Sequence, residues 1–398
     1  MTGTASTEAA EFKEASGLEV ISIPSHRPCR REDLPDLVYQ NEEQKWEAVA
    51  SQVRSAHDQG RPVLVGTTSV QNSELLAGKL KALGISCRLL NARPENSARE
   101  AEIIGASGRK HAVTISTNMA GRGTDILLGG NSSVMAKLRI RQVLFPMLFP
   151  EDLAKTLEMP DDFYPVALTE KVHQAVSEAA EMVANSWNPV VSSGSAELLA
   201  GELLARASGI DSNDEGHVEA LRKAYELVER EFRAVTSAVR VEVLTLGGLL
   251  VLGTERHESR RIDNQLRGRA GRQGDPGTTR FILSLSDDVF RVFGGGAVEA
   301  LASGLTSSEP ISSPLLSTAL DDAQTRVEGY FSGIRQQVFR YDAVMDEQRK
   351  ALYDLRRRAL LGSDDDTAAI MLEFSNQSMD ELADLSDPSR PLEEWPFP

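Results

Sequence analysis

The chain has 398 residues, a hydrophobic content of 41% and a charged content of 26%, values typical of a globular protein with two or three domains. Its net charge of −16 argues against general nucleic-acid binding, because contacts with a phosphate backbone require a basic surface. The six histidines and two cysteines show no metal-ligand spacing, and no apolar run reaches the roughly 18 residues of a membrane span.

The first 40 residues have the character of a connection between domains. A small, polar start at Met1–Ala5 precedes the Pro-rich stretch Pro24–Pro35. Proline favours extended backbone, so we expect residues 1–40 to be a linker that enters from another domain.

Residues 41–130 alternate between helical and strand-like composition. Strands alternating with helices at short intervals predict an α/β fold, in which a parallel sheet is flanked by helices. Ligands of such sheets bind at the carboxyl ends of the strands, where the polar turns Thr67–Ser69 and Thr117–Asp125 are expected. The predicted helices cover residues 41–59, 72–83 and 91–106, and the predicted strands cover residues 62–66, 87–90 and 112–116.

Residues 131–246 interrupt this alternation and are helical in composition, with Ser- and Asp-rich joints. We therefore expect a helical insertion, whose chemistry the sequence does not reveal. The α/β pattern resumes over residues 247–300, with predicted strands at 248–253 and 280–285.

A long helix is predicted over residues 316–360, because its apolar residues recur mainly at steps of three or four. At 1.5 Å per residue it would extend about 65 Å, so we expect a helical scaffold over 301–362 that bridges several domains. A coiled coil is the alternative, but the irregular steps disfavour a heptad seam. We expect the acidic tail, residues 363–398, to be at best partly ordered.

The stretch Gln265–Asp275 carries Arg267, Arg269 and Arg272 among small residues. Guanidinium groups stay charged and match phosphate oxygens in a two-pronged geometry. A helix through this run would place Arg269 and Arg272 one turn apart, as arginine fingers for the γ-phosphate of a nucleotide held on another surface. The alternative is a solvated basic helix.

A second candidate segment is the Gly-rich turn that ends at Asp125. Gly121 and Gly123 let the backbone approach a ligand, and Arg122 can reach phosphate. Asp125 can accept hydrogen bonds from ribose hydroxyls or fix a neighbouring arginine. Gln265 and Gln273 are suited to orient water or phosphate, whereas we expect His257 to be structural.

Two elements of phosphoryl transfer are absent from residues 1–398. There is no Gly-x-x-x-x-Gly-Lys-Ser/Thr phosphate loop, and no predicted strand ends in an Asp-Glu pair that could hold magnesium. We therefore expect these residues alone to hydrolyse ATP poorly or not at all.

Several segments together resemble the SecA family of preprotein-translocase ATPases. The resemblance covers residues 1 to about 360 except much of the insertion, which is similar in length and character to one in cyanobacterial and plastid SecA. The segments that carry it are Met-Thr-Gly-Thr-Ala (1–5), Asp-Leu-Pro-Asp-Leu-Val-Tyr (33–39), Val-Gly-Thr-Thr-Ser-Val (65–70), residues 117–130, residues 253–275 and Tyr-Asp-Ala-Val-Met-Asp-Glu-Gln-Arg-Lys (341–350).

The resemblance implies a RecA-like fold, the second helicase-type motor domain, with residues 301–362 as the scaffold. It implies ATP as cofactor, with Mg²⁺ held mainly by a first motor domain that residues 1–398 lack. The implied finger arginines are Arg269 and Arg272, and Gln265 and Gln273 are the implied nucleotide sensors. Arg122 and Asp125 would contact nucleotide across the cleft between the motor domains.

The implied partners are preproteins, a SecY-type channel and the first motor domain or a full-length SecA, with peripheral membrane contact and no nucleic acid. The implied location is the plastid stroma and thylakoid periphery, or the bacterial cytoplasm and inner face of the plasma membrane. Leu250 departs from the family, which usually carries His there. We expect a fragment, a truncated gene product or half of a split motor.

Two alternative functions remain open at this point. The chain could be the rear half of a nucleic-acid helicase, which shares the arginine stretch, although the acidic balance speaks against it. It could instead be a non-enzymatic module that binds and regulates a motor partner.

Overall fold

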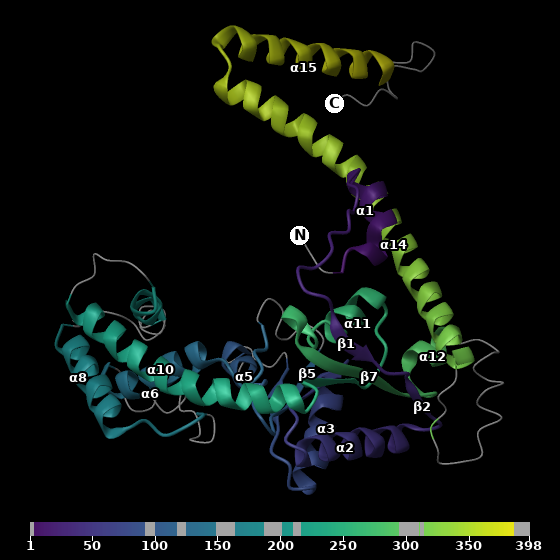
Figure 1. Cartoon of the computed structure of the whole chain (residues 1–398). Helices are drawn as coiled ribbons and strands as arrows, with labels where there is room; N and C mark the ends of the chain where they lie inside the picture. Colours follow the sequence, from purple (N-terminus) through teal and green to yellow (C-terminus); the bar gives the residue numbers. More distant parts are fainter. Residues whose placement is uncertain are drawn as a thin grey trace. The chain divides into compact units, whose positions relative to one another are not determined.

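The computed structural model describes residues 4–91, 100–117, 125–148, 164–186, 201–209, 216–293, 310 and 314–385 (Figure 1). The chain divides into two compact units. The sheet unit consists of residues 1–13 and 18–328, and the helical unit consists of residues 14–17 and 329–398.

The sheet unit is built on a seven-stranded, wholly parallel sheet. The strand order is β1-β7-β6-β3-β5-β4, and β2 also pairs with β7, beyond the end of β1. This arrangement confirms the predicted α/β fold. The strands are β1 (Arg30–Asp33), β2 (Leu37–Tyr39), β3 (Val63–Thr67), β4 (Arg88–Leu90), β5 (Val113–Thr117), β6 (Leu249–Gly253) and β7 (Pro276–Ser284).

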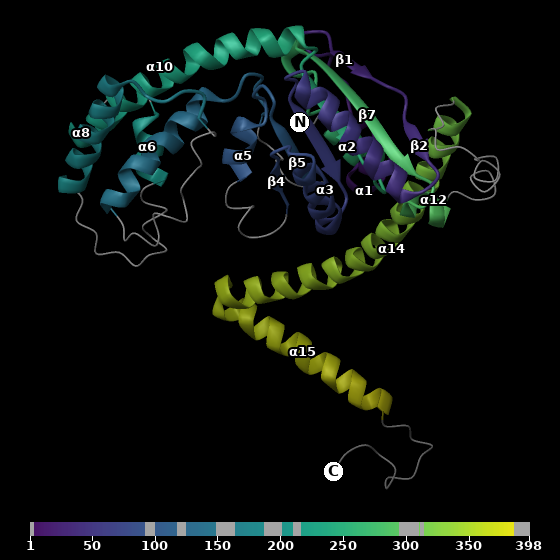
Figure 2. The same cartoon turned by 90° about the horizontal axis from the view of Figure 1, so that it is seen from below.

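Helices cover both faces of this sheet. On one face, α2 (Glu42–Asp58) and α3 (Val70–Ala82) bury Val63 and Val65 of β3 (Figure 2). The opposite face, which includes Leu64, packs against α5 (Glu100–Ala106), Ala270 after α11 (Arg260–Arg267), and the end of α10 (Gly216–Thr245). Strands buried on both faces read as continuous apolar runs, which explains why β6 is Leu-Leu-Val-Leu-Gly.

Polar caps begin three of these helices. Asn41 Oδ1 accepts from the Gln44 backbone N–H at 3.0 Å, and Ser69 Oγ accepts from that of Asn72 at 3.1 Å. Ser259 Oγ likewise accepts from the Arg261 N–H at 3.2 Å. Each bond satisfies a donor that a free helix end would leave unpaired.

The segment expected to be a linker instead contributes two strands. β1 pairs residue by residue with the first four residues of β7, and Val38 of β2 is fully buried beside Phe281. The linker expectation therefore fails over residues 30–33 and 37–39, whereas residues 24–29 contain neither helix nor strand. Three of the four β1 residues are exposed, so β1 carries no apolar pattern.

Where the structure describes residues 131–246 they are mainly helical, as expected, although residues 164–169 are not. α6 (Ser132–Leu148), α8 (Glu170–Ser186) and most of α10 share a separate apolar core that contains Ile140, Val176 and Phe232. The last turns of α10 leave that core, because Val243 is buried under the sheet. α10 thus belongs to two cores.

The long predicted helix is present as α14 (Pro314–Leu361), and it passes from the sheet unit into the helical unit at Glu328–Gly329. Within the sheet unit it buries Leu320, Ala323 and Val327. In the described part of the tail, residues 364–385 form a helix that was not predicted, α15 (Asp364–Leu385). Further short helical segments are Ser6–Glu8, α1 (Ala9–Ser16), residues 201–207, Arg272–Gly274 and α12 (Asp288–Phe293).

Replacing Gly253 with alanine is expected to destabilise the sheet unit by about 1–3 kcal/mol, as overpacking of a dense core does. A Cβ at Gly253 would lie 2.3 Å from two ring atoms of the buried Phe281. The matched control is Gly78→Ala in α3, where nothing lies within 4 Å. Alanine there should stabilise by up to about 1 kcal/mol, since it favours helix. Urea unfolding midpoints distinguish the two, and equal shifts would contradict the prediction.

Candidate functional site

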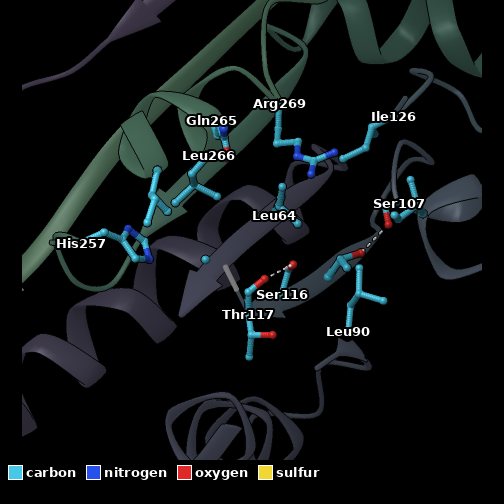
Figure 3. A pocket seen from close by; sticks show the side chains of 14 residues that line it. Leu64, Leu90, Ser107, Ser116, Thr117, Ile126, His257, Gln265, Leu266 and Arg269 are labelled. Atoms are coloured by element: carbon cyan, nitrogen blue, oxygen red, sulfur yellow. Dashed lines mark hydrogen bonds between the residues drawn. The ribbon is translucent and has the colours of Figure 1, made fainter. Parts of the chain in front are cut away.

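A small pocket lies on the face of the sheet that α11 covers (Figure 3). Its wall comes from β3, β4 and β5, from α5, and from Gln265, Leu266 and Arg269 in and after α11. Its volume of about 30 Å³ suffices for about two water molecules. The pocket therefore does not enclose a nucleotide, and a ligand of that size would contact only the surface around it.

The arginine run does not form one continuous helix, contrary to expectation. α11 ends at Arg267, and Gly271, in the left-handed conformation at φ 71°, precedes a short 3₁₀ turn at Arg272–Gly274. Arg269 lies in the intervening turn, where its N–H bonds to the Leu266 carbonyl at 3.0 Å. Residues 268–275 are called the arginine loop below.

The arginine loop lies beside the amino ends of β6 and β7. A Cβ at Gly277 would lie 2.7 Å from the backbone nitrogen of Gly271, and Gly277 pairs with Leu249, the first residue of β6. At the carboxyl ends of the strands, polar side chains in and after the turn that follows β3 bond within the protein. Glu255 accepts hydrogen bonds from Thr68 and Asn72. The arginine loop therefore does not lie with the turn Thr67–Ser69, which was expected at the carboxyl ends of the strands.

Within the loop, Arg272 and Gln273 meet Asp125, which is 147 residues away from Arg272 in sequence. Arg272 Nη1 lies 2.6 Å from Asp125 Oδ1, and Gln273 Nε2 lies 3.3 Å from Asp125 Oδ2. Arg272 Nε also donates to the Gly268 carbonyl at 2.8 Å. Of the two roles foreseen for Asp125, fixing a neighbouring arginine is the one that these contacts support.

The charge of Arg269 is disfavoured by its surroundings. Burial lowers the pKa of its guanidinium and the nearby Arg272 lowers it further, whereas Glu100 and Asp125 act in the opposite direction. Arginine nonetheless stays protonated near neutral pH. An anion beside Arg269 and Arg272 would offset both the lost hydration and the repulsion, so the loop fits a phosphate group.

Of the remaining predicted site residues, the structure describes Gln265. Gln265 lines the same pocket wall as Arg269, and its amide Nε2 donates to Thr4 Oγ1 at 3.3 Å. Gly121, Arg122 and Gly123 lie outside the described residues. The nucleotide roles of all these residues stay predictions.

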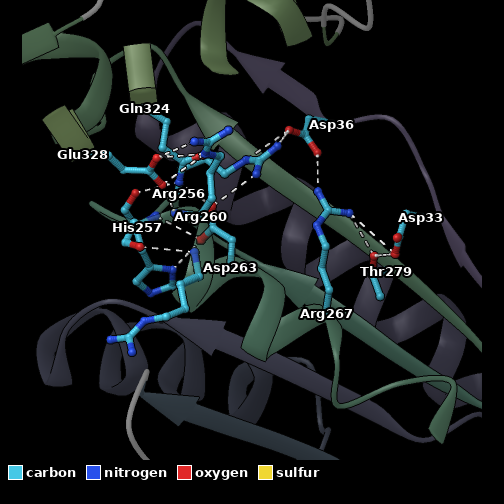
Figure 4. A network of polar contacts seen from close by, with 12 residues as sticks. Asp33, Asp36, Arg256, His257, Arg260, Asp263, Arg267, Thr279, Gln324 and Glu328 are labelled. Atoms are coloured by element: carbon cyan, nitrogen blue, oxygen red, sulfur yellow. Dashed lines mark hydrogen bonds and ion pairs between the residues drawn. The ribbon is translucent and has the colours of Figure 1, made fainter. Parts of the chain in front are cut away.

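The start of α11 is held by the first turns of α14, and both segments belong to the sheet unit (Figure 4). The buried Gln324 Nε2 donates to the His257 carbonyl at 2.8 Å and to Asp263 Oδ2 at 2.7 Å. Glu328 accepts from both the backbone N–H and the guanidinium of Arg260, at 2.6 and 2.7 Å. These bonds fix the helix that precedes Arg269.

His257 is buried and lies 2.7 Å from Asp263, measured from Nδ1 to Oδ1, which agrees with the structural role expected for it. Burial raises the pKa of Asp263, but the hydrogen bond with His257 and the charge of Arg256 outweigh it and hold the pKa below its usual value. Asp263 is therefore an ionised anchor inside the network at neutral pH.

A second part of this network joins α11 to β7, and the sequence reading missed it. The guanidinium carbons of Arg256 and Arg267 lie 4.5 and 4.7 Å from the centre of the Phe281 ring, and both arginines pair with Asp36. Cation–π contacts and ion pairs together stabilise this corner of the sheet. The sequence signal for this contact was the motif Asp-Leu-Pro-Asp (33–36), in which two carboxylates flank a leucine and a proline.

Metal and membrane features were also sought among the residues that the structure describes. No cluster of three or more His, Cys, Asp or Glu side chains that could hold a metal ion occurs in that part of the chain. Over the same residues, none of the helices combines the length and the apolar character needed to cross a bilayer.

Comparison with known proteins agrees with the motifs and the fold. Residues 28–309 match the model of the SecA P-loop domain, and residues 310–397 match that of the SecA Wing and Scaffold domain. The chain is 47% identical to the chloroplastic protein translocase subunit SecA of Ostreococcus lucimarinus over 100% of its own length and 44% of that relative. The SecA subunits of Synechocystis sp. and Thermosynechococcus vestitus are 46% and 45% identical, each over 99% of this chain and 45% of the relative.

The chain thus spans less than half the length of these relatives. The two matched models cover nearly all of its residues, and the first alone covers well over half. The resemblance seen in the sequence is confirmed: the chain belongs to the SecA family.

Proposed function

We propose that this chain supplies the second nucleotide-binding domain of an ATP-driven protein-translocation motor. The observation that carries the proposal is the arginine loop, where Arg272 pairs with Asp125 at 2.6 Å and lies close enough to Arg269 to lower the pKa of the Arg269 guanidinium. A triphosphate relieves that cost. Because residues 1–398 contain no Gly-x-x-x-x-Gly-Lys-Ser/Thr motif, the phosphate cradle and Mg²⁺ come from residues outside this range.

In this proposal Arg269 and Arg272 contact the phosphates as charge on them develops. Gly121, Arg122, Gly123 and Asp125 border the nucleotide, with Asp125 holding Arg272 in place. Gln265 and Gln273 respond to the nucleotide state, since each lies beside a finger arginine.

The partners follow from the family. The relatives are named protein translocase subunits, so we propose that the motor acts on preproteins at a SecY-type channel and contacts the membrane peripherally. One relative is chloroplastic and others are cyanobacterial. The proposed location is accordingly the plastid stroma and thylakoid periphery, or the bacterial cytoplasm and inner face of the plasma membrane.

The proposal predicts ATP hydrolysis only when the missing elements are added. Steady-state ATPase activity is measured for the chain alone, and after mixing with the separately expressed portion of the Ostreococcus relative that this chain does not cover. The mixture is expected to hydrolyse ATP at least about tenfold faster than the sum of its parts, because fingers and cradle must act together. Each part alone serves as the control.

Three other outcomes would overturn the proposal. Hydrolysis by residues 1–398 alone would mean that they hold a complete site. Stimulation by DNA or RNA but not by the added portion would favour a helicase half. Tight binding of the added portion without turnover would favour a regulatory module.

A further inference from the structure

The last helix of the insertion, α10, contacts two segments: the arginine loop, and the backbone that follows Asp125. Arg240 of α10 donates from Nη2 to both carboxylate oxygens of Asp275, each at 2.9 Å. Asp275 ends the arginine loop, two residues after Gln273 and three after Arg272. The ion pair thus ties α10 directly to the loop that carries the candidate finger.

α10 also meets the segment on the other side of the cluster. A Cβ at Gly129 would lie 2.3 Å from the Thr236 carbonyl oxygen and 2.9 Å from the Arg240 backbone nitrogen. The backbone four residues after Asp125 therefore runs against α10 at the turn that carries Arg240. Residues 236–240 of α10 thus contact both Gly129 and Asp275. These two residues follow Asp125 and Arg272, whose side chains pair at 2.6 Å.

This stretch of α10 is a stiff support, because its neighbours are fixed in two cores. Phe232 is fully buried among the insertion helices, and Val243 is fully buried under the sheet. Because the helix is anchored on both sides of Arg240, the backbone position from which this side chain extends is held in place. The loop it holds is buried at Ala270, whereas no residue of its 3₁₀ turn is buried and Gln273 adopts a positive φ of 54°.

We propose that Arg240 is a positioning residue for the finger Arg272: by holding Asp275 it fixes the arginine loop against Asp125. This inference rests on the proposed function and deepens it, because it assigns the insertion a contact with the nucleotide site. Arg240 touches no substrate in this account. Its effect on turnover passes through the geometry of residues 272–275.

The test combines a measurement on the chain alone with one on the motor mixture described above. Arg240→Ala and, independently, Asp275→Asn should raise hydrogen–deuterium exchange of the amides of residues 270–275, while β6 and β7 remain protected. In the mixture both variants should lower kcat about tenfold and change KM less than about twofold, as misplacement of a catalytic group does. Arg240→Lys, which keeps the charge, should recover part of both losses.

The matched control is Arg233→Ala on the same helix, because Arg233 pairs only locally with Glu229, four residues earlier, and should change neither readout. Faster loop exchange without a change in kcat would overturn the positioning role in turnover, and unchanged exchange would overturn it altogether. A wild-type mixture without ATPase activity would overturn the proposed function instead, and the exchange measurement would still decide whether Arg240 orders the loop.

Discussion

Replacing Arg269 with alanine is expected to lower kcat of the reconstituted motor about 1,000-fold, the low end of the range for arginine fingers. The physical reason is electrostatic. The burial that lowers the pKa of Arg269 leaves its charge poorly hydrated, so a phosphate oxygen becomes its favoured partner. Steady-state ATPase measurements at saturating ATP check the prediction, because an interaction made in the transition state changes kcat more than KM.

The control for this prediction is Arg291→Ala on α12, an exposed arginine that forms an ion pair with Asp288 three residues earlier. It should leave kcat unchanged. Arg269→Lys separates charge from shape, because lysine keeps a charge but offers no planar fork, and it should recover less than a tenth of the lost rate. A kcat for Arg269→Ala within about threefold of wild type would rule out the finger role.

The sheet and its helices were predictable because burial leaves a local pattern in the sequence. β6 is apolar at every position up to its final glycine, and α14 repeats apolar residues at helical spacing, so both could be read directly. β1 could not, because its Arg-Arg-Glu-Asp sequence has no apolar residue and is held by backbone pairing with β7 and by polar contacts such as that of Thr279 with Asp33. α15 was overlooked although Ser363 and Asp366 form reciprocal capping bonds, a signature visible in the sequence.

The candidate site was predictable in its residues but not in its geometry. The arginines and Asp125 were recognised from residue type and family motif. Their pairing depends on a contact between residues 147 positions apart, which no local spacing encodes. The helix expected through Arg269 and Arg272 failed because Gly271 takes a left-handed conformation that ends helical continuation. Sequence spacing therefore singled out the residues of the loop and misjudged its shape, while their nucleotide roles stay predictions.

Among single substitutions in the sheet unit, replacement of the buried Lys45 is expected to lower the free energy of unfolding most. Lys45 is 1% exposed, and its Nζ lies 2.6 Å from Asp287 Oδ1, 3.5 Å from Glu255 Oε1 and 4.9 Å from the centre of the Trp46 ring. Burial raises the pKa of Asp287 to about 6, although Lys45 and the Ser284 N–H both act to lower it. The lysine is thus the charge that favours the ionised form of Asp287.

Lys45→Met is expected to lower the free energy of unfolding by about 3–5 kcal/mol at pH 7.5, since it leaves buried carboxylates without their cation. Because the pKa of Asp287 is raised in the folded state, this carboxyl group contributes stability at pH values below 3.8, its ordinary pKa. That contribution is lost as the pH rises through about 6. Removing Lys45 raises that pKa further, so the deficit of the variant should grow with pH and shrink at pH 5, where Asp287 is largely protonated.

Urea unfolding followed by tryptophan fluorescence at pH 5 and pH 7.5 measures this difference, because Trp46, one of three tryptophans, is buried beside the lysine. The control is Lys81→Met on α3, an exposed lysine whose loss should change stability by less than about 0.5 kcal/mol at either pH. A deficit of the same size at both pH values would show that Asp287 is not the group that requires the cation. The pH difference is therefore the decisive quantity, since it isolates one carboxylate from the packing change that the methionine also introduces.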